Sequence, residues 1–253
     1  MKRVHLFLKS VMLFFLLMFA TPLQAGELRI SVAASMTDLF KDLISSFGKN
    51  NPEVVILPNF GPSGGLAKQI NQGAPADLYV SANPKWMKYL VEQQKIAVST
   101  KKTFAHNSLV FIGRPKNGIS ALTDLPSLER IGIGSPKSVP AGQYAQQALA
   151  KTGLYASLLQ AGKLVMAKDV RQALIYADRG ETDGSFVYKT DALLARSAKI
   201  LFEVDQELYE RVTYPVAITI MGVDNQDAKD FYHFVTSESA KEIITQYGFS
   251  LPE

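Results

Sequence analysis

The chain has 253 residues, with 27 Lys and Arg against 23 Asp and Glu and a formal net charge of +4. It contains no cysteine, which excludes disulfides, thiolate metal sites and a cysteine nucleophile. No run of five or more like charges occurs, so the charge pattern does not indicate a basic surface built for nucleic acid or a membrane.

The first 25 residues have the order of a secretory signal peptide. Lys2, Arg3 and Lys9 form a basic region, and Val11–Ala20 is an unbroken apolar run. The alternative, an uncleaved membrane anchor, would need roughly 18 or more apolar residues. We therefore expect export to the periplasm with cleavage after Ala25. The mature chain then keeps 24 basic and 23 acidic residues, a net charge of +1.

Beyond residue 25, apolar β-rich runs alternate with segments of helical periodicity almost throughout. The runs expected as strands are Leu28–Ala33, Val54–Pro58, Asp77–Val80, Ser108–Ile112, Arg130–Gly134, Lys163–Met166, Gly184–Val187, Lys199–Phe202 and Val212–Met221. The segments expected as helices are Met36–Phe47, Leu66–Asn71, Pro84–Gln93, Ala141–Lys151, Val170–Arg179, Thr190–Arg196, Gln226–Thr236 and Glu238–Tyr247. This alternation predicts an α/β fold of mixed, mostly parallel sheets with helices on both faces.

Four of the expected helices begin with small residues that leave backbone N–H groups exposed. The four starts are Ala33-Ala34-Ser35, Gly61-Pro62-Ser63-Gly64-Gly65, Val139-Pro140-Ala141-Gly142 and Lys168-Asp169-Val170. Helix capping explains each one alone, and Ser35 with Asp38 fits a capping box. All four, however, follow the carboxyl ends of strands, where open α/β sheets bind ligands. Unpaired N–H groups and the helix dipole favour an anion there, and Tyr188, at another strand end, can add a hydroxyl.

The second of these helix starts also fits the G-x-S-x-G nucleophile elbow of serine hydrolases. That mechanism needs an acid and then a histidine later in the chain. His106 comes too early to follow most candidate acids, and His233 falls inside an amphipathic helix. The scattered histidines also lack metal-ligand spacing. A hydrolase that uses Ser63 remains the alternative to anion binding.

The chain resembles the periplasmic molybdate-binding proteins of ABC importers over essentially its whole mature length. The matching stretches are Ala33-Ala34-Ser35, Ser63-Gly64, Gly73-Ala74-Pro75-Ala76-Asp77-Leu78, Lys85-Trp86-Met87, Val139-Pro140-Ala141-Gly142, Asp169-Val170-Arg171 and Val187-Tyr188. The resemblance implies the type II periplasmic binding protein fold, in which two α/β lobes are joined by a hinge of two crossovers. On this basis residues 26–105 and 215–253 form one lobe and residues 106–214 form the other.

The resemblance also implies the ligands of the anion, which are two serine hydroxyls, two backbone N–H groups and a tyrosine hydroxyl. The matching positions here are Ser35, Ser63, Ala141, Val170 and Tyr188. The loop around Ser63 departs from the serine-rich loop of familiar members, because Pro62, Gly64 and Gly65 flank a lone serine. Arg171 and Lys137 are expected to lie outside direct contact with the anion.

The implied function is capture of molybdate, and of tungstate, for delivery to an inner-membrane ABC permease. No catalytic residue, cofactor, resident metal or nucleic-acid partner is implied, and a monomer is expected. A site made only of donors disfavours protonated phosphate, because the proton of the ligand would face another donor at a cost of about 1–3 kcal/mol. The same argument does not separate molybdate from sulfate, so a sulfate-binding protein stays open.

Overall fold

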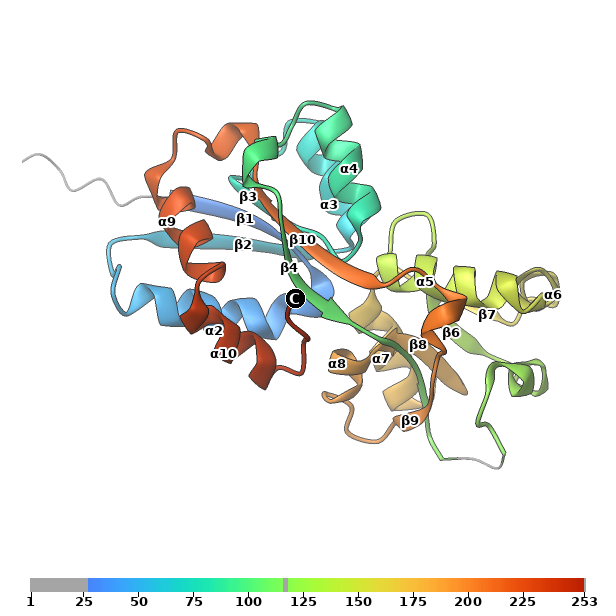
Figure 1. The fold of residues 1–253 in the computed structure, drawn as a ribbon. Coiled ribbons are helices and arrows are strands. Elements are labelled where there is room, and N and C mark those ends of the chain that lie inside the picture. Colours follow the sequence, from blue (N-terminus) through green and yellow to red (C-terminus); the bar gives the residue numbers. More distant parts are fainter. Residues whose placement is uncertain (1–26, 116–117, 253) are drawn as a thin grey trace, which may run out of the picture.

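The computed structural model describes residues 27–115 and 118–252 and divides them between two sheets that lie side by side, each with its own helices (Figure 1). The predicted signal peptide and its cleavage site lie outside the described residues. Within the described ranges, no helix is long and apolar enough to cross a membrane.

The first sheet contains the strands nearest to both ends of the described chain. Its spatial order is β2 (Val55–Gly61), β1 (Glu27–Ala33), β3 (Leu78–Val80), β10 (Val212–Ile218) and β4 (Lys102–Asn107). Its helices are α2 (Thr37–Gly48), α3 (Ser63–Asn71), α4 (Pro84–Glu92), α9 (Gln226–Val235) and α10 (Glu238–Gln246). In Figure 1, α2, α9 and α10 cover one face and α3 and α4 the other. Both faces are therefore buried, which suits the apolar strands β1 and β3.

The two faces of the first sheet have separate apolar cores. The α2 face contains an aromatic cluster in which Phe47 and Phe231 meet edge to face, with ring centroids 5.2 Å apart. The α3 and α4 face packs Leu66, Tyr79 and Trp86 together. These helices therefore hold the loops at the carboxyl ends of the strands in fixed positions.

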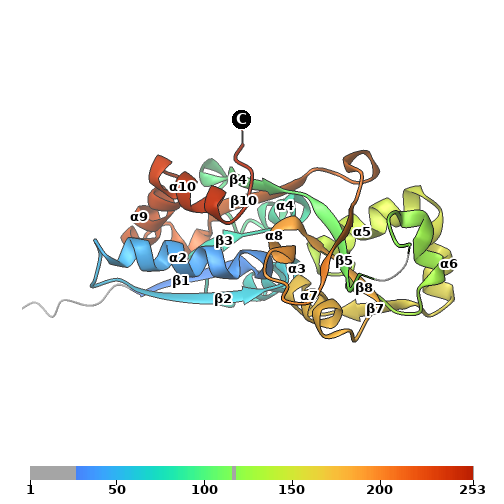
Figure 2. The same ribbon diagram turned by 90° about the horizontal axis from the view of Figure 1, so that it is seen from below.

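The second sheet is built in the same way from the middle of the chain. Its spatial order is β7 (Leu164–Ala167), β6 (Ile131–Gly134), β8 (Gly184–Tyr188), β5 (Leu109–Gly113) and β9 (Lys199–Glu203). Its helices are α5 (Pro140–Lys151), α6 (Leu154–Gln160), α7 (Val170–Arg179) and α8 (Lys189–Ala192). They lie on both sides of the sheet (Figures 1 and 2).

The predicted mixed α/β architecture with helices on both faces is confirmed. Each sheet has two parallel pairings, around β1 and β6, and two antiparallel pairings, around β10 and β5. Antiparallel pairing is thus more frequent than the alternation of strands and helices indicated. It arises because β5 and β10 are the strands next to the crossovers, where the chain reverses between the two sheets.

The chain passes between the sheets twice. The first passage is short, because β4 ends at Asn107 and β5 begins at Leu109. The second runs from the end of β9 at Glu203 to the start of β10 at Val212. The lobe boundaries expected from the sequence, at 105/106 and 214/215, fall inside β4 and β10, within three residues of these passages.

Candidate functional site

The four helix starts singled out in the sequence come together where the two sheets meet. A small cavity there is lined by residues of β1, β2, α3, α5, α7 and the end of β8. Its lining residues are Ala33, Ala34, Ser35, Gly61, Pro62, Ser63, Ala82, Val139, Pro140, Ala141, Val170 and Tyr188. All five residues expected to hold an anion are among them. The structure therefore brings the whole predicted set to one place.

The cavity measures about 10 Å³. Roughly 10–15 Å³ is the minimum that holds one water molecule. Ser35, Ser63 and Tyr188 are 4%, 1% and 1% exposed. A space this small has no room for a sugar or a peptide.

Backbone geometry supplies two of the donors. Pro140 occupies the first turn of α5, which places Ala141 where the N–H group has no partner inside the helix. Asp169 caps α7, and its side chain accepts from the Gln172 N–H at 2.8 Å, so Val170 begins the helix. The N–H groups of Ala141 and Val170 therefore lie at the positive ends of two helix dipoles.

The Ser63 hydroxyl is held as a donor toward the cavity. Its Oγ accepts the Ala82 N–H at 2.9 Å, and the Tyr79 hydroxyl donates to the Ser63 carbonyl at 2.8 Å. A serine hydroxyl has one proton to donate and lone pairs that accept. Because Ala82 already occupies a lone pair, the proton of Ser63 remains available to a ligand.

Ser35 is arranged differently from Ser63. Its hydroxyl donates to the Tyr214 hydroxyl over a long 3.3 Å, and Asn107 Nδ2 donates to the same oxygen at 3.3 Å. The predicted capping box of Ser35 and Asp38 is wrong. Ser35 lies in a 3-10 turn, α2 begins two residues later at Thr37, and no side chain caps that helix. Both side chains instead make contacts far along the sequence.

The Tyr188 hydroxyl is buried and has no hydrogen-bond partner among the described residues. Burial, reinforced by the neighbouring Tyr214 and Tyr144, raises the pKa of this phenol well above its usual value. Tyr188 therefore keeps its proton at neutral pH. A buried hydroxyl without a hydrogen-bond partner costs free energy. Because the Tyr188 side chain lines the cavity, its hydroxyl indicates a donor for an acceptor atom of a ligand.

The lining residues include no histidine and no charged side chain. Ser63 therefore has neither a base nor an acid beside it on the cavity wall, as a nucleophile elbow would need. In the described ranges, no three His, Asp or Glu side chains gather as a metal site would require. What the wall offers is hydroxyl and N–H donors on an apolar background.

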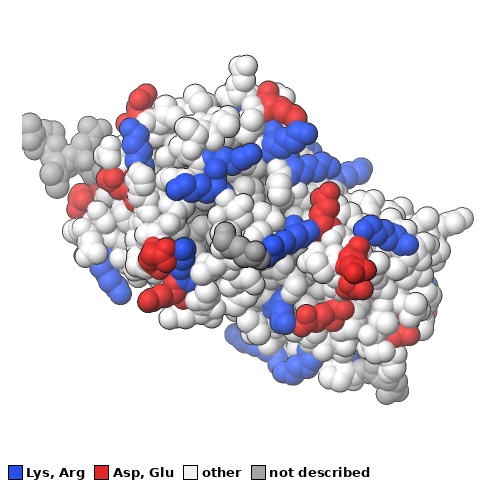
Figure 3. All heavy atoms as spheres, viewed as in Figure 1, with Lys and Arg blue, Asp and Glu red and all other residues white. Residues whose placement is uncertain are grey.

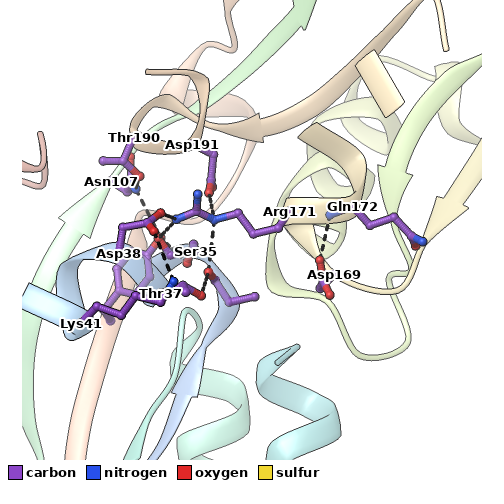
Figure 4. Close-up of polar contacts among 12 residues, drawn as sticks. Ser35, Thr37, Asp38, Lys41, Asn107, Asp169, Arg171, Gln172, Thr190 and Asp191 are labelled. Atoms are coloured by element: carbon purple, nitrogen blue, oxygen red, sulfur yellow. Dashed lines mark hydrogen bonds and ion pairs between the residues drawn. The ribbon is translucent and has the colours of Figure 1, made fainter. Parts of the chain in front are cut away.

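Two sets of contacts join the walls of this cavity across the seam between the two sheets. On the α3 side, the Gly64 N–H donates to the Ser138 carbonyl at 2.9 Å. A Cβ placed on Gly64 would lie 2.8 Å from that carbonyl oxygen and 2.5 Å from the Trp86 ring, so only glycine fits. On the α2 side, Arg171 extends from α7 toward Ser35 and Asp38 (Figure 4).

Arg171 does not line the cavity, and Lys137 is exposed, so neither contacts its interior. The contacts of Arg171 across the seam, and the buried Asp191 that pairs with it, were not found from the sequence. The one available signal was an arginine in the first turn of a helix that begins at the site.

Comparison with known proteins places these features in a family. Residues 28–250 match the model of the family described as "Bacterial extracellular solute-binding protein". The chain is 37% identical to the molybdate-binding protein ModA of Haemophilus influenzae, over 89% of this chain and 91% of that protein. It is also 37% identical to ModA of Escherichia coli, over 89% and 90%. The solved periplasmic molybdate-binding protein of Azotobacter vinelandii has the same fold, with a TM-score of 0.80 at 24% identity over 89% of this chain and all of that one.

Proposed function

Because the chain belongs to the family of bacterial extracellular solute-binding proteins, we propose that it captures molybdate, and also tungstate, and delivers the anion to an ABC permease. The observation that carries the proposal is the convergence of Ser35, Ser63, Ala141, Val170 and Tyr188 on one enclosed cavity without a charged side chain. The relatives named as molybdate-binding proteins support the choice of anion.

The strength expected of such a site is sufficient for capture from dilute solution. Hydrogen bonds to a charged group contribute about 1.5–3 kcal/mol each. Five donors, with the Ser35 hydroxyl turned from Tyr214 to the anion, therefore contribute on the order of 10 kcal/mol before ordering costs, and a Kd of 1 μM needs about 8.2 kcal/mol. Neutral donors are enough, and no lysine or arginine has to touch the anion.

The donor-only wall favours anions that carry no proton at neutral pH, such as molybdate, tungstate and sulfate. Phosphate usually keeps one proton, which would face a donor on this wall. One of the two acceptor positions of the Ser63 hydroxyl is already occupied by the Ala82 N–H, and the backbone N–H groups of Ala141 and Val170 can only donate. An unpaired proton of this kind costs about 1–3 kcal/mol, so phosphate binds more weakly.

The enclosure of the cavity supports binding by two moving lobes, residues 26–105 with 215–253 and residues 106–214. The anion reaches an open form, and closure buries it between Ser35 and Ser63 on one side and Ala141, Val170 and Tyr188 on the other. A ligand that binds the closed form better shifts the population toward it, and the permease recognises that form.

The protein acts as a binding protein in the periplasm, not as an enzyme, and works as a monomer. Cleavage after Ala25 removes residues 1–25 and leaves a mature chain of nearly balanced charge. On the face seen in Figure 3, basic and acidic side chains are interspersed rather than gathered into a field of one sign. This surface supports a small anion as the partner, rather than nucleic acid.

The test is a competition series by titration calorimetry on the mature protein with molybdate, tungstate, sulfate and phosphate. We expect molybdate and tungstate to bind with a Kd of 1 μM or below and phosphate to bind at least tenfold more weakly. If sulfate binds most tightly, the ligand is sulfate and not molybdate. No binding of any tetrahedral oxyanion overturns the proposal, and ester hydrolysis abolished by Ser63→Ala would establish the hydrolase.

A further inference from the structure

Arg171 is the cationic side chain that crosses the seam beside the cavity. It belongs to the first turn of α7, directly after Val170, and its side chain is 22% exposed. Figure 4 shows the guanidinium between Asp38 on one side and Asp191 on the other, with Ser35 next to it. The side chain therefore touches both sheets at once, through groups on α7 and α8 and groups around the start of α2.

The contacts with the first sheet involve the turn that carries Ser35. Arg171 Nε donates to the Ala34 carbonyl at 3.2 Å, and Nη2 donates to the Ser35 carbonyl at 3.2 Å. Nη2 also pairs with Asp38 Oδ2 at 2.9 Å. The fork of N–H groups on a guanidinium suits such a set of separated, fixed acceptors, whereas the three donors of a lysine all radiate from one nitrogen. These three contacts fix the backbone of the turn from the opposite sheet.

The contact within its own sheet has a different character. Arg171 Nε lies 2.9 Å from Asp191 Oδ1, and the Asp191 side chain is fully buried. Asp38 on the other side of the seam is 38% exposed. An exposed ion pair is screened by water and worth little, whereas removing the cation from a buried carboxylate is strongly destabilising. When the seam opens, the guanidinium therefore stays with Asp191 and leaves Asp38.

We propose that Arg171 is an interlobe clasp, which Asp191 holds ready on one lobe and which engages Asp38 and the carbonyls of Ala34 and Ser35 when the lobes close. It is a positioning residue and not a ligand, because it acts on the anion through the turn that presents the Ser35 hydroxyl. This inference rests on the proposed function. Its consequence is kinetic: the clasp stabilises the closed arrangement of the lobes and so slows the release of a bound anion.

The contacts of Arg171 distinguish this role from charge compensation of the anion. Asp38 Oδ2 and Asp191 Oδ1 each lie 2.9 Å from a nitrogen of the guanidinium, so the cation already has acidic partners in both sheets. It is also absent from the cavity lining. A residue that attracts the anion electrostatically would change the association rate, whereas a clasp changes the dissociation rate.

The test measures association and dissociation rates of isotope-labelled molybdate for the mature protein. We expect Arg171→Met to raise the dissociation rate about tenfold and to leave the association rate within threefold. Arg171→Lys restores part of the loss. Asp38→Asn gives a smaller increase that vanishes when Arg171 is already Met, because both substitutions remove the same contact. The matched control is Arg179→Met, at the exposed end of the same helix, which should change neither rate.

A second measurement works without ligand and separates failure of this inference from failure of the proposed function. Amide hydrogen exchange of residues 34–38 should be faster in Arg171→Met than in wild type and unchanged in Arg179→Met, when each protein is measured the same number of degrees below its own melting temperature. If wild type binds no molybdate, this experiment still decides the clasp. Equal exchange in all three proteins overturns the clasp. So does a fall in the association rate of Arg171→Met that matches the rise in its dissociation rate.

Discussion

Replacing Tyr188 by phenylalanine is expected to act in opposite directions on the free and the ligand-bound protein. The substitution removes one hydroxyl and keeps the ring, which packs edge to face against Tyr214 and Tyr144 at centroid distances of 5.8 and 6.4 Å. The side chain is 1% exposed, and its hydroxyl has no partner among the described residues. Only the bound anion, in the proposed function, gives that hydroxyl an acceptor.

The two magnitudes follow from this geometry. A buried polar group without a partner costs about 1–3 kcal/mol, so its removal should stabilise the free protein by up to that amount. A hydrogen bond to a charged ligand is worth about 1.5–3 kcal/mol. Because each 1.4 kcal/mol is tenfold in affinity, Tyr188→Phe should raise the Kd for molybdate roughly ten- to hundredfold.

The assay pairs urea unfolding of the free protein with calorimetric titration of molybdate, each on wild type and Tyr188→Phe. We expect the unfolding midpoint to rise and the affinity to fall. A Kd within twofold of wild type refutes the placement of Tyr188 as a ligand. A free variant that is less stable than wild type by more than about 1 kcal/mol refutes the argument that the hydroxyl has no partner before the anion binds.

Three further substitutions probe the same cavity and its seam. Ser63→Ala removes a donor to the ligand and leaves the Ala82 N–H without its acceptor, so both stability and affinity should fall, which the same two assays measure. Gly64→Ala places a Cβ 2.8 Å from the Ser138 carbonyl and should hold the lobes apart, seen as a larger radius of gyration by X-ray scattering with molybdate, whereas Gly65→Ala should not. Burial raises the pKa of Asp191 to about 7, against the lowering effect of its arginine, so the folded protein takes up this proton before the unfolded chain does. The stability of wild type relative to Asp191→Asn should therefore increase as the pH falls from 8 toward 5. The measurement is the melting temperature of both proteins over this range, and a constant difference between them contradicts the raised pKa of Asp191.

The alternation of strands and helices was readable from the sequence because the buried strands are short apolar runs between turn residues. Leu28–Ala33 differs from β1 by one residue at its start. The strand β4 was missed, because four of the six residues in Lys102–Asn107 are polar and the segment becomes a strand by pairing with β10. The helix α6, Leu154–Gln160, was missed as well, since it is a short helix that follows α5 after only Thr152 and Gly153.

The site was predicted less evenly than the fold. Small residues at strand ends indicate N–H donors by local geometry alone, and these positions do line the cavity. The expectation that the Ser35, Ser63 and Tyr188 hydroxyls bind the anion came from a resemblance, because nothing local distinguishes Ser63 from an ordinary helix cap. The capping box failed because Asp38 pairs with Arg171, 133 positions along the chain. Contacts between the two sheets, such as this ion pair, depend on how the sheets are placed relative to each other. No periodicity in the sequence encodes that placement.

The glycine at the seam has a consequence for observing the molecule. Trp86 is the single tryptophan of the chain, and its ring lies against Gly64, whose N–H reaches across to Ser138. The ammonium groups of Lys85 and Lys68 lie 5.7 and 5.8 Å from the ring centroid. Separation of the walls would let water reach the indole on this side. The intrinsic fluorescence of one native residue should therefore follow opening and closing in real time, without a label and without any change to the protein.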